Sequence, residues 1–205
     1  MGHGGAYVTE VAAEVEARRR AVKDAPWTWL RQVHADTVVT VAEPGAGAGT
    51  TADASVSARP GCVLAVLAAD CAPVALVSPE GVVAAVHAGW RGVHAGVLQR
   101  AVEAARRLGA TQLQAVLGPC IRAECYQFGA EDLAAVAANL GDAVRGRTTG
   151  GHPALDLPAA VVAALGQAGV AQFEDVGVCT ACSDGYFSWR GGQELARQAM
   201  VVWRD

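Results

Sequence analysis

One cysteine and two histidines are spaced so that a folded chain could bring them together as metal ligands. Cys71 follows Asp70 at the end of the apolar run 62–69, and His87 follows the apolar run 82–86. His34 lies in a Gln-Val-His-Ala segment far upstream. One sulfur and two nitrogens suit zinc, and three protein ligands leave a coordination position for water or substrate. Because structural zinc sites usually have four protein ligands, this set favours catalysis.

Two cysteine-centred mechanisms fit the same residues. In the first, His34, Cys71 and His87 hold zinc, and the metal activates water near neutral pH. In the second, Cys71 and His87 are the thiolate and the base of a metal-free hydrolase or acyl transferase, with Asp70 or Asp156 orienting the imidazole. His34 discriminates between them, because a nucleophile pair needs no third ligand.

Copper is the alternative metal. A blue-copper site needs two histidines, one cysteine and an axial methionine. The chain has only Met1 and Met200, and five histidines in all. Both methionines lie outside the motifs, so zinc is favoured and a copper-dependent polyphenol oxidoreductase is kept as the alternative.

Several side chains near these motifs could bind a substrate. A guanidinium grips oxyanions in a fork, so arginines are candidates for phosphate or carboxylate binding. The aromatic candidates could stack on a flat base, although packing in the core or at its edge is the role that we expect for them. The arginines are Arg91, Arg190 and Arg197, and the aromatic residues are Trp90, Tyr186 and Trp189. His94 and His152 are expected at the surface.

The remaining cysteines include a pair with the spacing of a redox motif or a zinc knuckle. Cys179 and Cys182 are separated by two residues, and no second pair has that spacing. Cys120 and Cys125 are the residues that could join them in a four-cysteine site. In a cytosolic chain, cysteines are more often free thiols or ligands than disulfides.

The apolar patterning predicts a mixture of strands and helices that would position these residues. The runs 62–69, 74–77 and 82–86 predict buried strands, and the turn 78–81 makes the last two a hairpin. Because strands and helices mix without a regular β-α-β rhythm, the predicted fold is α+β, with a mixed sheet. Further strands are predicted at 27–30, 38–41, 112–117, 176–178, 186–189 and 199–203, and helices at 9–22, 94–108, 130–140 and 157–168.

Composition limits the partners and the location. The chain has 205 residues, 52% of them hydrophobic, and a net charge of −4. This length and apolar content predict a single domain over residues 1–205. An acidic chain with scattered basic residues is not expected to bind nucleic acid. No apolar stretch reaches the roughly 20 residues of a membrane span, and no signal-peptide pattern is found, so we expect no membrane partner and a cytoplasmic location.

Taken together, the motifs resemble a known family. They are Gln-Val-His at 32–34, Ala-Asp-Ala at 52–54, Ala-Asp-Cys-Ala-Pro-Val at 69–74, His-Ala-Gly-Trp-Arg-Gly at 87–92, Gly-Pro-Cys-Ile at 118–121, Cys-Tyr at 125–126, Leu-Asp-Leu at 155–157, Cys-Thr at 179–180 and Ser-Trp-Arg at 188–190. Their order resembles that of the laccase-domain proteins, named multicopper polyphenol oxidoreductases and also described as purine nucleoside phosphorylases. The resemblance covers roughly residues 27–203. Residues 1–26 are divergent or shortened relative to the family.

The resemblance implies a zinc site made by His34, Cys71 and His87, the same three residues that the donor chemistry selects. It also implies a mixed β-sandwich flanked by helices. The implied activities are phosphorolysis of adenosine, inosine and methylthioadenosine, and deamination of adenosine. The implied partners are therefore a small-molecule nucleoside and phosphate. Asp70 and Arg91 are the side chains expected to take part in catalysis, and the oligomeric state is left open.

Overall fold

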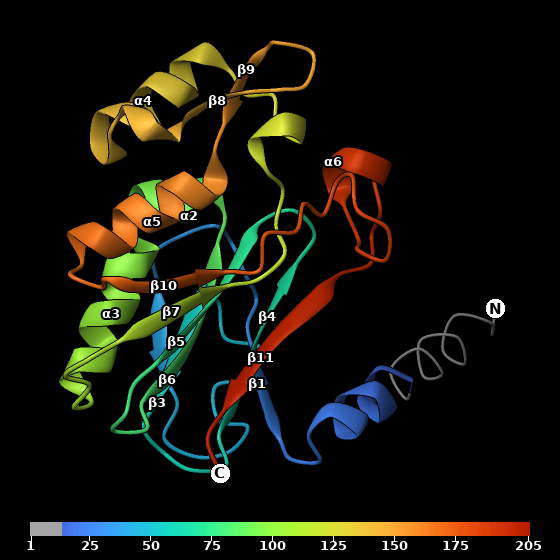
Figure 1. The fold of residues 1–205 in the computed structure, drawn as a ribbon. Helices are drawn as coiled ribbons and strands as arrows, with labels where there is room; N and C mark the ends of the chain where they lie inside the picture. Colours follow the sequence, from blue (N-terminus) through green and yellow to red (C-terminus); the bar gives the residue numbers. More distant parts are fainter. Residues whose placement is uncertain (1–13) are drawn as a thin grey trace.

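The larger sheet carries six strands and forms the centre of the protein (Figure 1). The structure is a computed structural model that describes residues 14–205. The strand order is β10-β7-β5-β6-β3-β2, and the sheet is mixed, because β2 and β10 run parallel to their neighbours whereas the inner pairs are antiparallel. The strands are β2 (Val38–Thr40), β3 (Ala54–Ser57), β5 (Ala72–Val77), β6 (Val83–Ala88), β7 (Gln114–Leu117) and β10 (Gln172–Asp175).

A second sheet of three strands packs against one face of the first. It consists of β1 (Trp27–Trp29), β4 (Val63–Ala68) and β11 (Gln198–Trp203), with β4 in the middle. Side chains from both sheets fill the layer between them, including Leu64 and Val66 of β4 and Ala85 of β6. This packing explains why β4 is apolar along its whole length and β6 is apolar up to His87: each has both faces covered.

Helices α2 (Trp90–Ala95), α3 (Val97–Arg107) and α5 (Leu157–Gln167) cover the other face of the six-stranded sheet (Figure 1). Helix α4 (Ala130–Leu140) packs against α5, and the short α6 (Trp189–Gly192) lies away from this helical layer. Helix α3 buries Val97, Leu98, Ala101, Val102 and Ala105, which recur with helical spacing on one side. Two short 3-10 turns, Ala123–Cys125 and Asp142–Val144, and the hairpin of β8 (Arg145–Arg147) and β9 (Pro153–Leu155) complete the upper part of the fold.

The predicted fold class is confirmed: the protein is α+β, with a mixed β-sandwich flanked by helices. The hairpin of β5 and β6 is also confirmed. The predicted helix 9–22 is helical over residues 14–22, and its first part lies outside the described residues. For residues 1–13, inclusion in the single domain stays a prediction.

Three secondary-structure predictions were wrong. The helix predicted at 94–108 is two helices, because Gly96 has a left-handed φ of 96° and ends α2. The strand predicted at 176–178 begins four residues earlier in the structure, as β10. The residues of β10 alternate between exposed and half-buried and do not form an apolar run. Residues 186–189 form no strand, because Ser188 caps α6 by accepting a hydrogen bond from the Gly191 backbone N–H.

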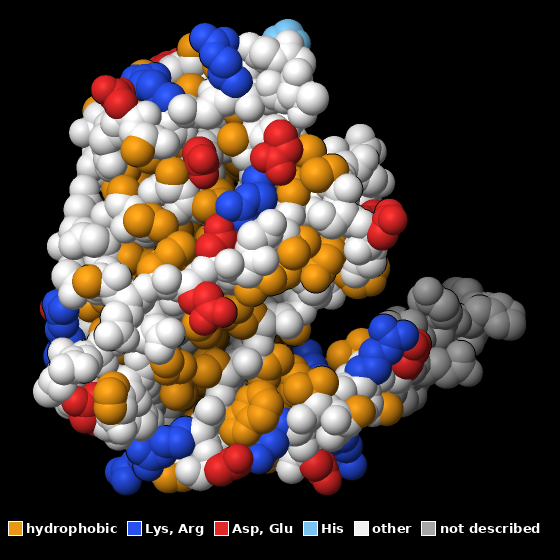
Figure 2. Space-filling model, viewed as in Figure 1, with side chains coloured by type: hydrophobic (Ala, Val, Ile, Leu, Met, Phe, Trp, Pro, Cys, Tyr) orange, Lys and Arg blue, Asp and Glu red, His pale blue; other side chains and the backbone are white. Residues whose placement is uncertain are grey.

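The surface bears on the expected partners. Figure 2 shows acidic and basic side chains interspersed with hydrophobic ones on the viewed face, rather than one continuous basic area. Within residues 14–205, no helix combines the length and the apolar content that crossing a membrane would require.

Candidate metal centre

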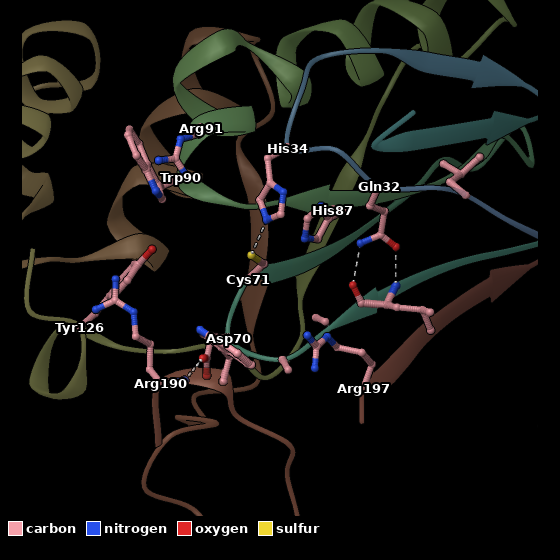
Figure 3. A pocket seen from close by; sticks show the side chains of 15 residues that line it. Gln32, His34, Asp70, Cys71, His87, Trp90, Arg91, Tyr126, Arg190 and Arg197 are labelled. Atoms are coloured by element: carbon pink, nitrogen blue, oxygen red, sulfur yellow. Dashed lines mark hydrogen bonds between the residues drawn. The ribbon is translucent and has the colours of Figure 1, made fainter. Parts of the chain in front are cut away.

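The three predicted metal ligands converge in the folded chain (Figure 3). Ligand atoms of His34, Cys71 and His87 all lie within 4.8 Å of one another. The Sγ atom of Cys71 is 3.6 Å from Nε2 of His34, and the two imidazole rings meet edge to face with their centroids 4.9 Å apart. Zinc bonds of about 2.0–2.3 Å place two ligand atoms on the same ion less than about 4.6 Å apart, so this donor set fits zinc with small adjustments.

The β-sheet register brings Cys71 and His87 together. Cys71 lies immediately before β5, and His87 in β6 is paired with Pro73 of β5. The β5–β6 hairpin therefore brings both residues to one edge of the six-stranded sheet. The apolar run 62–69 before Cys71 forms β4 of the other sheet, so only the run 82–86 ends at this edge. Cys71 is half-buried, whereas His87 is buried, so water has little access to the His87 side chain.

His34 comes from the connection between β1 and β2 and has a positive φ of 62°. Asp70 has a φ of 97°, so two of the three non-glycine residues with positive φ within 14–205 lie at this site. The side chain of Gln32 fixes the same connection to β4: its Nε2 donates to the Leu67 carbonyl at 2.7 Å, and its Oε1 accepts from the Leu67 N–H at 2.8 Å (Figure 3).

Asp53 orients both histidines, a role that was not predicted from the sequence. Its side chain is fully buried. Its Oδ1 lies 2.8 Å from Nδ1 of His87 and accepts the backbone N–H of His34 at 2.8 Å. Its Oδ2 accepts the N–H groups of Val33 and Ala35 at 3.1 and 2.9 Å. A carboxylate behind a ligating histidine is a common outer partner in metal sites. The one indication of this role in the sequence was that Asp53 lies in the Ala-Asp-Ala segment at 52–54, which is among the family motifs.

Gly89 permits the close approach of the His34 and Cys71 side chains. A Cβ atom at this position would lie 2.7 Å from Cδ2 of His34 and 3.0 Å from Sγ of Cys71. Gly89 has φ −67° and ψ 154°, an ordinary extended conformation. Glycine is therefore required here for space rather than for backbone freedom.

Cys71, His87 and Asp53 have shifted pKa values. Burial opposes the Cys71 thiolate, but hydrogen bonds and positive charge from His34 and His87 outweigh burial and lower the pKa of Cys71 to about 6. Burial also opposes charging of His87, and its contacts with Asp53 and Cys71 raise its pKa to about 9. The Asp53 pKa is lowered despite burial, by His87 and by the backbone N–H groups it accepts. In the protein without metal, these shifts favour a thiolate beside an imidazolium.

A cavity of about 680 Å³ opens above the three ligands. This volume is in the range of small-molecule sites. The predicted arginines all reach it, as do two of the predicted aromatic residues, whereas Tyr186 does not and Tyr126 takes part instead. Besides the ligands, the side chains lining the cavity include Gln32, Asp70, Trp90, Arg91, Tyr126, Trp189, Arg190 and Arg197.

The arginines differ in how they are held. Arg190 lies 5.0 Å over the Tyr126 ring and donates to the Gln127 carbonyl, and Arg197 donates to two backbone carbonyls of its own loop. The Arg91 guanidinium lies 4.5 Å over the Trp90 ring. Within residues 14–205, no hydrogen bond or ion pair to protein engages the Arg91 guanidinium, so its donors are open to a ligand.

Asp70 binds the segment that carries α6. Its Oδ1 accepts the hydroxyls of Thr180 at 2.9 Å and Ser188 at 2.6 Å, and its Oδ2 accepts the Arg190 backbone N–H at 2.7 Å. The structure therefore places Asp70 at the cavity, with its carboxylate engaged by protein groups.

The prediction that Asp70 or Asp156 orients the imidazole was wrong, because Asp53 takes that position. Asp156 instead caps α5 by accepting the Ala159 N–H. The expectation for His94 and His152 is confirmed, since both are exposed.

The fold and the site together define a class: an α+β protein with a candidate His-Cys-His metal centre at the base of a pocket sized for a small molecule. Comparison with known proteins places the chain more closely. The family model described as multi-copper polyphenol oxidoreductase laccase matches residues 3–205, so the chain belongs to this family.

Relatives and solved structures agree with this assignment. A purine nucleoside phosphorylase of Streptomyces coelicolor is 41% identical over 196 residues, covering 94% of this chain and 81% of the relative. A purine nucleoside phosphorylase of Deinococcus radiodurans is 41% identical over 178 residues, covering 84% and 68%. The crystal structure of a Neisseria meningitidis protein of family DUF152 superposes with a TM-score of 0.81 at 32% identity, covering 93% of this chain and 79% of that one.

Proposed function

We propose that this protein is a zinc-dependent enzyme of purine nucleosides, which cleaves adenosine, inosine and methylthioadenosine with phosphate and also deaminates adenosine. The observation that carries the proposal is the convergence of His34, Cys71 and His87 at the base of a cavity that also holds three arginines. Relatives that share 41% of aligned residues are named purine nucleoside phosphorylases. The names of these relatives suggest the substrate class, and the cavity is of a size that could hold such a substrate.

The donor set supports zinc over copper. One thiolate and two imidazoles suit both metals, but a blue-copper centre adds an axial methionine. Met200, the one methionine within residues 14–205, is absent from the residues that line the cavity. A zinc ion held by three protein ligands would supply a Lewis acid and an open coordination position.

The protein side chains would bind and orient the two substrates. In phosphorolysis, a phosphate oxygen forms a bond to the ribose C1′ as the bond from C1′ to the base nitrogen breaks, and the base leaves with the electron pair and takes up a proton. Arg91, whose donors are open, is the side chain we assign to the phosphate, because a guanidinium matches an oxyanion in a fork. The Trp90 and Tyr126 rings would flank the flat base. In deamination, water attacks the purine carbon that bears the amine and ammonia leaves.

Asp70 has a positioning role in this proposal. Its carboxylate is occupied by Thr180, Ser188 and the Arg190 backbone, so it would hold the α6 wall of the cavity rather than touch the reacting atoms. The proposal includes a cytoplasmic location, which suits a chain with six free cysteines.

The test compares Cys71→Ala with Cys62→Ala, a buried cysteine in the layer between the two sheets. Inosine and phosphate are supplied, and hypoxanthine and ribose 1-phosphate are measured beside the zinc content. We expect Cys62→Ala to keep both zinc and turnover. We expect Cys71→Ala to lose one zinc per chain and at least about a hundredfold in kcat/KM, as for loss of an essential group. Full turnover by Cys71→Ala would disprove the proposal.

Two alternatives make different predictions for the wild-type protein. The family description favours testing copper, for which oxygen uptake on a phenol by copper-loaded protein is the assay. The low pKa of Cys71, about 6, beside His87 favours testing a metal-free hydrolase. In that case chelation leaves both turnover and the alkylation rate of Cys71 unchanged, whereas a zinc-bound thiolate becomes more reactive when the metal leaves.

A further inference from the structure

A second group of three cysteines lies outside the site described above. The sulfur atoms of Cys125, Cys179 and Cys182 are all within 4.8 Å of one another. Cys179 is buried, Cys125 is half-buried and Cys182 is exposed. The sequence suggested that Cys120 and Cys125 could join the Cys-x-x-Cys pair in a four-cysteine site, and the structure brings in Cys125 but not Cys120.

The backbone holds these three cysteines in place from two segments. Cys125 ends the 3-10 turn Ala123–Cys125, where its N–H donates to the Arg122 carbonyl at 3.0 Å. The Cys-x-x-Cys segment forms a turn in which the Ser183 N–H donates to the Cys179 carbonyl at 3.1 Å. A β-bridge between Cys120 and Cys179 ties the two segments together. These main-chain contacts hold the two segments that carry the three thiols close together.

Three sulfurs at this separation match the ligands of a thiophilic cation. Zinc–sulfur bonds of about 2.3 Å in a tetrahedral site put neighbouring sulfurs about 3.8 Å apart. Thiolates select soft or borderline ions such as zinc over magnesium or calcium. The exposed side of Cys182 leaves room for water as a fourth ligand. A disulfide would use only two of the three sulfurs and would leave the third unexplained.

We propose that Cys125, Cys179 and Cys182 bind a second zinc ion that joins the two segments beside the cavity. Both segments lead directly into the wall of the main site. Tyr126, next to Cys125, lines the cavity, and Thr180, between the other two ligands, donates its hydroxyl to Asp70 at 2.9 Å. A metal at this position ties the Tyr126 segment to the segment that leads to α6.

The experiment counts zinc in the full chain by elemental analysis. We expect about two zinc ions per wild-type chain, about one in Cys71→Ala, about one in Cys182→Ser and none in the double variant. Cys62→Ala is the matched control and keeps both. Cys182 is exposed, so its replacement leaves the core intact. Folded Cys71→Ala protein that carries no zinc would overturn the proposal.

A measurement on the wild-type chain keeps the test decisive if a variant fails to fold. We expect Cys182 to resist iodoacetamide in zinc-loaded protein and to react after chelation, since a metal-bound thiolate is shielded. Rapid alkylation of Cys182 in zinc-loaded protein would contradict the second site. If non-reducing peptide mapping of freshly purified protein shows Cys179 linked to Cys182, the two residues form a disulfide and the second zinc site is disproved.

Discussion

The Nδ1 atom of His87 lies 2.8 Å from Oδ1 of the buried Asp53, and this contact determines which ring nitrogen faces the metal centre. With Nδ1 engaged, Nε2 is the nitrogen left to bind a metal. The same carboxylate also accepts the backbone N–H groups of Val33, His34 and Ala35. One side chain therefore positions two ligands that are far apart in the sequence.

Replacing Asp53 tests this relationship. Asp53→Asn keeps the shape but removes the charge, and its amide can present an N–H toward backbone donors. We expect zinc affinity to fall about 10–100-fold, measured by competition with a chromophoric chelator. Asp142→Asn, at an exposed carboxylate, is the control and leaves affinity unchanged. Wild-type affinity in Asp53→Asn would show that the contact does not orient the ligands.

Adding a methyl group at Gly89 tests the crowding of the metal centre. In Gly89→Ala the new Cβ would lie 2.7 Å from the His34 ring, so that ring must move. We expect zinc affinity to fall about tenfold or more, because overpacking costs about 1–3 kcal/mol. Gly166→Ala in α5 is the matched control, since a Cβ there meets no atom within 4 Å. It should raise the free energy of unfolding by about 0.5–1 kcal/mol.

Replacing Asp70 separates positioning from metal binding. Asp70→Asn weakens the hydrogen bonds from Thr180, Ser188 and the Arg190 backbone, so the α6 wall of the cavity loosens. We expect KM for the nucleoside to rise about tenfold, as loss of about 1.5 kcal/mol of charged hydrogen bonding implies, with zinc content unchanged. Ser188→Ala should show a smaller rise. Loss of zinc with KM unchanged would assign Asp70 to the metal centre instead.

The ion pair of Arg122 and Asp175 predicts a pH-dependent stability. Arg122 donates two hydrogen bonds to Asp175 at 3.1 and 2.8 Å, with both side chains about three-quarters buried. Burial raises the Asp175 pKa, but together Arg122 and the Gly177 N–H lower it by more than burial raises it. The folded pKa of Asp175 is therefore below its ordinary value. The stabilisation is therefore complete above the unfolded pKa of about 3.9 and disappears as pH falls through the folded pKa.

Arg122→Met is the variant that measures it. We expect urea unfolding near neutral pH to give a free energy lower than that of the wild type by about 1 kcal/mol, allowing for partial exposure. The difference should shrink as the pH falls below the unfolded pKa of about 3.9 and through the lowered folded pKa, because Asp175 then takes up a proton. A difference that stays constant with pH would show that Arg122 stabilises the fold through packing alone.

Much of the site was predictable because strand patterning is local. The apolar runs that end at Asp70 and Val86 predicted strands, and the turn between the last two runs predicted the hairpin that sets Cys71 beside His87. The preference for zinc is a prediction that rests on donor chemistry alone. The failures have local causes: Gly96 divides a helix whose apolar spacing continues through it, and Ser188 starts a helix where aromatic residues favoured a strand.

The sequence by itself predicted the donor set, the α+β class and the hairpin whose open end brings two of the candidate ligands together. The tertiary structure decided that Asp53, and neither Asp70 nor Asp156, supports His87, and that Cys125 joins Cys179 and Cys182. The physical reason is that a buried carboxylate or thiol is matched to its partners through contacts between segments far apart in the chain. Hydrophobic periodicity places a residue on an element, but it does not specify which distant loop packs against it.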